Sequence, residues 1–403
     1  MSKKIIFISI VVIVSITIGI FLFVQPKNNT LTDFQELENL TPNPQPFPHP
    51  ENTPKASEST RVCEASNAVS FKSCVSKVNN NQADNIEVTS LIACTGKNAC
   101  MADLNNIKRP VSLYGRNSDD GFKRLDTYDY ALITVMDSKD VKIYNLTFDE
   151  NENQPCTPVS NPANCKDTIF VSNSENIVID NVTISHSKSA AIGAYNSRKV
   201  VITNSNFINS YLFGVILNIS MDHDIGSLAI ASARVEGNLF RNIKSNGLVL
   251  YQTQAKQNDP IIVRGNTFIN NHRENIYLLC GPDAQSGTGP CPGGQLYLTN
   301  DVANVKIENN IIKDGNSKIG TGGIEFSNFN IRNVDVVGNE IYNNNMWGVY
   351  INPNANNVSD IFISKNKIYN NGLLPQYGGL NIFIPNNTSV IESGNCFTLS
   401  CMP

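Results

Sequence analysis

The sequence predicts an all-β fold, a solenoid of stacked parallel β-coils, because one six-residue phrase recurs through most of the chain. The phrase V235-E-G-N-L-F240 ends in an apolar residue and has a second one five places earlier. Its copies follow one another at intervals of 23 to 44 residues, and a repeat of this length indicates a solenoid or an array. The closing apolar residues are Phe148, Ile184, Phe207, Phe240, Phe268, Ile312, Ile341, Ile368 and Phe397.

A second phrase completes each repeat. Some seven residues after the closing apolar position, a small or turn residue precedes alternating apolar residues, as in Gly247 to Leu250 and Gly348 to Ile351. Period-two alternation bounded by Gly and Asn favours a strand over a helix. Short strands with no helical period between them make each repeat one coil, which buries its inward residues against its neighbours. We expect about nine to eleven coils.

A polar slot lies two residues after the closing apolar position. An amide at the same turn of successive coils can donate and accept hydrogen bonds along the stack, so we interpret this slot as an asparagine ladder. The same reasoning assigns a structural role to His186. The slot holds Glu150, His186, Asn209, Asn242, Asn270, Asp314, Asn343 and Asn370.

With these phrases, residues from about 105 to 403 resemble the right-handed parallel β-helix superfamily, the pectate-lyase-like fold. The resemblance implies right-handed coils but leaves the chemistry open, because the fold hosts lyases, hydrolases, epimerases, phage tailspikes and non-catalytic binders. The His-Gly pair of polygalacturonases is absent, and D119-D120-G121 lies before the first clear repeat. The calcium-binding aspartate cluster of pectate lyases has no evident match. The sequence therefore leaves the cofactor open: calcium is one candidate, but no motif for it is present.

Residues 1–24 differ from everything after them. Lys3 and Lys4 precede an uncharged apolar run, Ile5 to Val24, which is long enough to cross a bilayer as one transmembrane helix. The lysines predict a cytoplasmic N-terminus, with the rest of the chain outside as a periplasmic or cell-surface protein. A cleaved signal peptide, which would make the protein secreted, is the alternative. The proline-rich residues 25–60 predict a disordered, semi-rigid tether.

Residues 61–110 predict an N-terminal cap, and 111–403 the parallel β-helix. Phe71, Cys74, Val75 and Val78 form an apolar stripe of helical spacing, so a short amphipathic helix is expected over 68–79. The open end of a β-helix exposes core residues and unpaired strand edges, and this helix would cover them.

The ten cysteines fall in sequence-local couples, which in an exported protein predict disulfides closing short loops. The pairing of the first four remains open. No Cys-x-x-Cys occurs and the four histidines are scattered, so no metal site is predicted. The couples are Cys63 and Cys74, Cys94 and Cys100, Cys156 and Cys165, Cys280 and Cys291, and Cys396 and Cys401.

Five excursions interrupt the coils. In a solenoid, such insertions form loops on one flank and often border the binding face. They cover 149–167, 218–233, 252–260, 279–300 and 313–322.

The repeat register predicts which side chains share a surface column, with about 4.8 Å between coils. One column holds Tyr211, Lys244 and His272, with Arg273 beside it. Aromatic rings can stack on sugar faces, and Lys and Arg can bind uronate carboxylates, so the columns suit a glycan. The second column consists of Tyr277, Glu325, Tyr350 and, in the last copy, Asn381, with Tyr251 beside it.

These residues allow two reactions. In a lyase, Lys244, His272 or Arg273 would remove the proton next to the carboxylate, and Glu325 would act as the acid. In a hydrolase, two carboxylates must flank the bond, and Glu325 and Glu274 are the candidates.

We therefore expect an extracytoplasmic polysaccharide-binding protein that acts on an acidic glycan as a lyase, hydrolase or epimerase. The alternative is a non-catalytic adhesion or scaffold protein of the cell envelope. The expected partners are a polysaccharide and, through the N-terminal helix, the membrane. A net charge of −4 gives no reason to expect nucleic acid.

Overall fold

A computed structural model describes most of the chain after residue 60. The described ranges are 61–96, 98–125, 130–151, 166–218, 232–271, 294–299, 301–315, 322–327, 329–373, 380–386 and 388–400. The predicted membrane segment (1–24) and tether (25–60) lie outside these ranges. Among the described residues, no helix combines the length and apolar character needed to cross a membrane.

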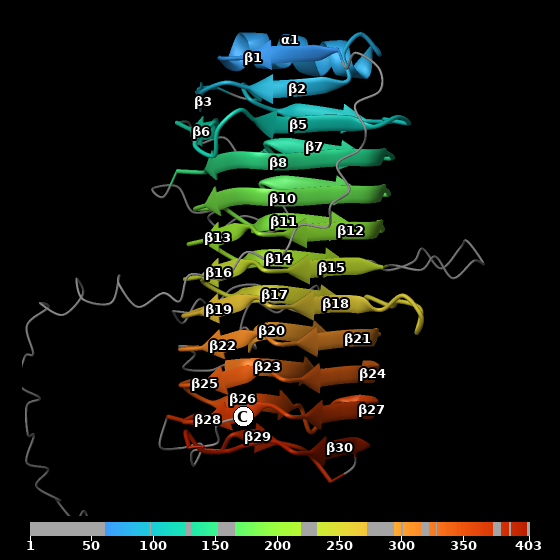
Figure 1. Ribbon diagram of the computed structural model, residues 1–403, viewed down its shortest axis with the longest axis vertical. Coiled ribbons are helices and arrows are strands. Elements are labelled where there is room, and N and C mark those ends of the chain that lie inside the picture. Colours follow the sequence, from blue (N-terminus) through green and yellow to red (C-terminus); the bar gives the residue numbers. More distant parts are fainter. Residues whose placement is uncertain are drawn as a thin grey trace, which may run out of the picture. The chain divides into compact units, whose positions relative to one another are not determined.

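Within the described ranges the strands form two parallel sheets, one of 20 and one of 10 strands, and one α-helix follows the first strand (Figure 1). Each strand pairs with the equivalent strand of the next coil. The ten rungs of the smaller sheet fall within the predicted nine to eleven coils, and the all-β solenoid is confirmed.

The 20-stranded sheet has two arms that meet at a bend, and β8 (Lys139–Asp149) and β10 (Glu175–Ser185) run through both. The first arm also contains β1 (Val62–Ala65), β2 (Asn85–Val88), β5 (Val111–Gly115), β12 (Arg198–Thr203), β15 (Ala233–Glu236), β18 (Ile261–Arg264), β21 (Ala303–Glu308), β24 (Phe329–Val337), β27 (Asn356–Ser364) and β30 (Val390–Ser393). The second arm contains β3 (Leu91–Cys94), β6 (Gly121–Arg124), β13 (Asn206–Ile208), β16 (Leu239–Arg241), β19 (Thr267–Ile269), β22 (Ile311–Lys313), β25 (Glu340–Tyr342) and β28 (Lys367–Tyr369).

The 10-stranded sheet completes each coil. It consists of β4 (Ala102–Asn105), β7 (Ile133–Met136), β9 (Ile169–Ser172), β11 (Ala190–Tyr195), β14 (Phe213–Asn218), β17 (Asn246–Tyr251), β20 (Gly294–Thr299), β23 (Gly322–Ser327), β26 (Trp347–Ile351) and β29 (Ile382–Phe383).

The recurring phrase has a physical explanation in the bend between the two arms. Its third residue adopts a positive φ in every described copy, for example Asn145 (55°), Asn204 (51°) and Gly237 (67°). Asn and Gly are the residues that tolerate this left-handed conformation, so the chain turns there without strain. The closing apolar residue follows in the second arm and is buried in all copies but the last, where Phe397 is 44% exposed. Phe240 stacks on Phe268 at 4.5 Å between ring centroids.

The most extended asparagine ladder of the described residues lies one position after this turn, not in the slot that the sequence suggested. Asn310 shows the pattern: its Nδ2 donates to Oδ1 of Asn339 at 2.9 Å, and its Oδ1 accepts from Nδ2 of Asn266 at 3.0 Å. The ladder runs through Asn238, Asn266, Asn310, Asn339, Asn366 and Asn395.

The slot that the sequence suggested contains left-handed residues with fewer hydrogen bonds. Nδ2 of Asn270 donates to Oδ1 of Asn242 at 2.8 Å, and Asn209 contacts His186. The slot is therefore mainly a second turn position, and its conformation explains the choice of Asn there.

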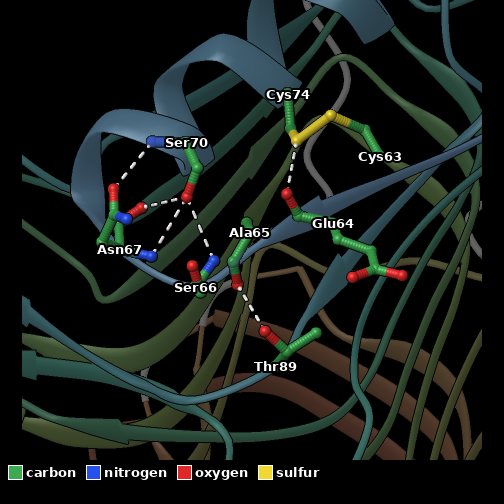
Figure 2. Close-up of a disulfide and its surroundings, with 8 residues drawn as sticks. All are labelled: Cys63, Glu64, Ala65, Ser66, Asn67, Ser70, Cys74 and Thr89. Atoms are coloured by element: carbon green, nitrogen blue, oxygen red, sulfur yellow. Dashed lines mark hydrogen bonds between the residues drawn. A yellow bond between two sulfur atoms is a disulfide. The ribbon is translucent and has the colours of Figure 1, made fainter.

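The predicted helix is confirmed as α1 (Ala68–Asn79), which buries Phe71, Cys74, Val75 and Val78. Its N-cap is Asn67, whose side chain accepts hydrogen bonds from the backbone N–H groups of the first turn (Figure 2). Such a cap satisfies donors that have no partner inside the helix. The helix packs on β1, β2 and β4 at the N-terminal end of the stack, as expected of a cover.

Two of the predicted disulfides lie in this end. Cys63 bonds to Cys74, which ties β1 to α1 (Figure 2). Cys94 bonds to Cys100. This pairing resolves the alternatives that the sequence left open. Cys396 is also disulfide-bonded. The remaining predicted partners, Cys156, Cys165, Cys280, Cys291 and Cys401, lie outside the described residues.

Candidate functional site

The outer face of the 10-stranded sheet contains the predicted second column. Strand pairing aligns Gly193 with Ile216, Ile216 with Val249, and Glu325 with Tyr350. The residues one place earlier, such as Leu248 and Ile324, point into the core and are fully buried. Period-two alternation therefore determines which side chains this face presents.

A group of three aromatic rings lies at the C-terminal end of this face. The ring centroids of Trp347 and Tyr350 in β26 are 4.5 Å apart, and the ring of Phe383 in β29 lies 5.4 Å from that of Tyr350. All three side chains are only half-buried. We call these three residues the aromatic platform. Partly exposed, mutually stacked rings form a rigid apolar surface of the kind that lines ligand sites.

Glu325 lies next to the platform, directly before Tyr350 in the register. The sequence predicted an exposed side chain, and this was wrong: Glu325 is only 1% exposed. Burial, followed by the negative charge of Glu325, raises the pKa of Tyr350. The two side chains are thus electrostatically coupled, and a buried acidic group beside a partly open aromatic surface is a typical feature of a reactive site.

Of the first predicted column, the structure describes Tyr211 and Lys244, and it brings these two side chains together. Lys244 places its Nζ 5.2 Å from the ring centroid of Tyr211, and both side chains are half-buried. Burial raises the pKa of Tyr211. These residues precede β17 and β14, so two coil steps, about 10 Å along the stack, separate Lys244 from Glu325. The cation and the acid therefore belong to neighbouring parts of one face rather than to one hydrogen-bonded cluster.

Two positions of the second column were assigned to the wrong residue. Strand pairing puts Tyr297 of β20, not Tyr277, between Val249 and Glu325. In the last coil it puts Phe383, not Asn381, beside Tyr350. Strand β20 lies inside a segment, 279–300, that the sequence treated as an excursion.

Several predicted site residues are not located by the structure. His272, Arg273, Glu274 and Tyr277 lie outside the described residues. Tyr251 is described: it is half-buried and follows Val249 by two positions in β17, so it lies on the same outer face. Over the described ranges, no group of three or more His, Cys, Asp or Glu side chains could hold a metal ion.

A second polar and aromatic group on this face was not predicted. Asp167 precedes β9, and its Oδ2 accepts a 2.8 Å hydrogen bond from the phenol of Tyr195 in β11. Its Oδ1 accepts from the backbone N–H of Ala190 at 3.0 Å. Burial raises the pKa of Asp167, which is only 5% exposed. The ring of Phe170 in β9 stacks on that of Tyr195 at 5.3 Å.

Sequence signals for the missed residues were weak. Trp347, the one tryptophan of the chain, begins its strand next to a turn and so falls outside strict alternation. Asp167 sits at the end of a long excursion, where the register is lost. The alternation of β9 itself, Ile169 to Ser172, could have identified Phe170 as an outward ring.

Several solved structures have a similar fold. An alginate lyase from Paenibacillus sp. str. FPU-7 is 12% identical with a TM-score of 0.52, and the alignment covers 82% of this chain and 100% of the lyase. The Dettilon tailspike protein is 13% identical with a TM-score of 0.54, and the alignment covers 84% of this chain and 61% of the tailspike protein. ORF18 of Geobacillus virus E2 is 10% identical with a TM-score of 0.58, and the alignment covers 83% of this chain and 61% of ORF18.

At these identities the likeness shows the fold alone, and the chain spans about three fifths of the length of the two virus proteins. No curated protein sequence matches it. The sequence profile described as "Right handed beta helix region" matches residues 137–286 and 168–359, which together span more than half of the chain. The chain therefore belongs to the right-handed β-helix family.

Proposed function

We propose that this protein binds a polysaccharide on the outer face of the 10-stranded sheet, with the aromatic platform as the main contact. The observation that carries the proposal is the set of three stacked, half-buried rings of Trp347, Tyr350 and Phe383. Sugar rings have apolar C–H faces, and a rigid aromatic surface binds them at little cost in side-chain entropy.

Glu325 places a carboxyl group beside the platform that could take part in catalysis. A carboxyl buried beside a bound sugar can donate or accept a proton at the glycosidic oxygen, which is the acid role assigned to it from the sequence. Lys244, about two coils away, supports an acidic glycan, because an ammonium can bind a uronate carboxylate. His272 and Arg273 remain proposed partners in this reaction.

The proposed location is outside the cytoplasm. The disulfides Cys63–Cys74 and Cys94–Cys100 favour an oxidising compartment. Residues 1–24 would anchor the chain in a membrane or direct its export, and 25–60 would hold the β-helix away from the bilayer.

The test is a binding and depolymerisation assay with purified protein on uronate-containing and neutral polysaccharides, with and without calcium. Tyr350→Ala should weaken binding by about 3- to 10-fold, because a stacked ring contributes about 0.5–1.5 kcal/mol. Tyr144→Ala is the matched control, since Tyr144 stacks on Tyr114 at 5.0 Å but lies in β8 of the other sheet.

Products separate the possible activities. Unsaturated ends that disappear in Glu325→Gln indicate a lyase, and new reducing ends without unsaturation indicate a hydrolase. Binding that Tyr350→Ala weakens, with no product from any polysaccharide, would assign the chain to the non-catalytic adhesion class. Equal binding by Tyr350→Ala and Tyr144→Ala would refute the proposed surface.

A further inference from the structure

The outer face of the 10-stranded sheet has a second aromatic group several coils away from the platform. It consists of Phe170 and Tyr195, whose ring centroids are 5.3 Å apart with an interplanar angle of 30°. Both side chains are half-buried, so part of each remains open to solvent.

The position of the Tyr195 ring depends on a missing side chain. Gly193 occupies the outward position of β11, and a β-carbon there would collide with Oδ2 of Asp167 and lie 2.6 Å from Cε2 of Tyr195. The ring of Tyr195 therefore folds back over residue 193 and lies against the sheet, in space that any other residue would fill. Glycine is required here for close approach rather than for its own backbone conformation.

Asp167 holds the ring in that position. Its carboxyl accepts from the phenol at 2.8 Å and is itself held by the backbone N–H of Ala190. A ring fixed on both sides loses little entropy when a ligand stacks on it, which is the condition for an efficient stacking site. Burial raises the pKa of the Asp167 carboxyl, although both of its oxygens accept hydrogen bonds.

We propose that Phe170 and Tyr195 form a second sugar-stacking site, which binds a distant part of the same polysaccharide chain as the platform. This inference rests on the proposed function and adds a minimum ligand length to it. Half-buried Ile216 and Tyr251 lie on the same face between the two groups, whereas Val249 and Glu325 there are buried.

The register gives the distance between the sites. From β11 to β26 the sheet advances by five strand pairings, through β14, β17, β20 and β23, or about 24 Å. Each sugar advances an extended polysaccharide by about one strand spacing, so a ligand needs about six sugars to reach both sites. Shorter oligosaccharides can occupy only one.

The test measures the affinity of the full chain for galacturonate and mannuronate oligomers from dimer to decamer. Phe170→Ala and Tyr195→Ala should weaken decamer binding by about 3- to 10-fold and leave trimer binding at the platform unchanged. Tyr350→Ala should weaken both. Tyr144→Ala again serves as the control, and thermal unfolding establishes that each variant is folded.

Phe170→Ala is the decisive variant, because its ring has no hydrogen bond to lose and its removal leaves the Asp167–Tyr195 contact in place. Decamer binding equal to that of the unaltered protein in both Phe170→Ala and Tyr195→Ala would overturn the inference while the proposed function stands. Decamer binding lost in Phe170→Ala but kept in Tyr350→Ala would support the second site and refute the platform. Absence of binding by every oligomer would refute both.

Discussion

Arg124 places its Nε 2.5 Å from Oε2 of Glu150, and both side chains are almost completely buried. A second guanidinium nitrogen donates to the backbone carbonyl of Tyr130 at 2.6 Å, and the guanidinium lies 4.0 Å from the centroid of the Tyr130 ring. An ion pair therefore fills a turn of the N-terminal coils where later coils contain asparagine.

Breaking this pair should destabilise the β-helix strongly. Arg124→Leu removes the cation bonded to the buried Glu150 carboxyl, on which the charge of Lys188 also acts, and removing one partner of a buried ion pair costs about 3–5 kcal/mol in the free energy of unfolding. Urea unfolding followed by circular dichroism measures the loss. The control is Arg264→Leu, because Arg264 pairs with Glu236 at 2.7 Å but is 41% exposed, so its loss should cost below about 1 kcal/mol. Similar losses in the two variants would contradict the distinction between the pairs.

Asp167 predicts how stability depends on pH. Burial raises its pKa in the folded state above the unfolded value, so the folded protein binds the proton more tightly. The contribution of this carboxyl is then most favourable at acid pH and is lost as the pH rises through the raised pKa. We expect Asp167→Asn to remove this part of the pH dependence, because the amide cannot ionise.

The measurement compares urea unfolding of the two proteins between about pH 4 and pH 8. The stability of the unaltered protein relative to Asp167→Asn should fall as the pH rises. A constant difference across this range would show that Asp167 titrates alike in the folded and unfolded chains.

The buried ladder predicts a large cost at single asparagines. Asn310 donates to Asn339 and to the carbonyl of Val263, and it accepts from the backbone and side chain of Asn266. Asn310→Ala leaves several buried groups without partners, so we expect a loss of about 3 kcal/mol or more in the free energy of unfolding. Asn79→Ala is the control, since Asn79 has a helical backbone and donates an exposed 2.8 Å bond to the carbonyl of Asp103, and the change should cost little.

The sequence predicted the fold well because the determinants of a β-coil are local. The phrase from Val235 to Phe240 contains the turn residue, the ladder residue and the core residue of one coil, each with its own side-chain requirement. The predicted register was wrong where two neighbouring segments carry the same local pattern. The residues 275–278 and 294–299 both fit the second phrase, and nothing within either segment shows which one pairs with β17.

The site was harder to predict because its contacts join different coils. The stacking of Trp347 on Tyr350 depends on the path of a turn, and the Asp167–Tyr195 contact depends on the absence of a side chain at Gly193. Burial of Glu325 likewise depends on neighbours outside its own strand. Spacing along the sequence contains none of this information, whereas it correctly aligned Glu325 with Tyr350 and brought Tyr211 close to Lys244.

His186 has the location of a turn residue rather than a catalyst. It adopts a positive φ of 60°, contacts Oδ1 of Asp149 through Nδ1 at 3.1 Å, and accepts from Nδ2 of Asn209 at 3.3 Å. Asparagine, which occupies the same slot in other coils, tolerates this backbone conformation and can bond to both neighbours. We therefore expect His186→Asn to keep polysaccharide binding, any activity and stability within about 0.5 kcal/mol. His186→Val should cost about 1–3 kcal/mol, because a β-branched residue is strained at positive φ. Loss of activity in a folded His186→Asn protein would instead place this histidine in the reaction.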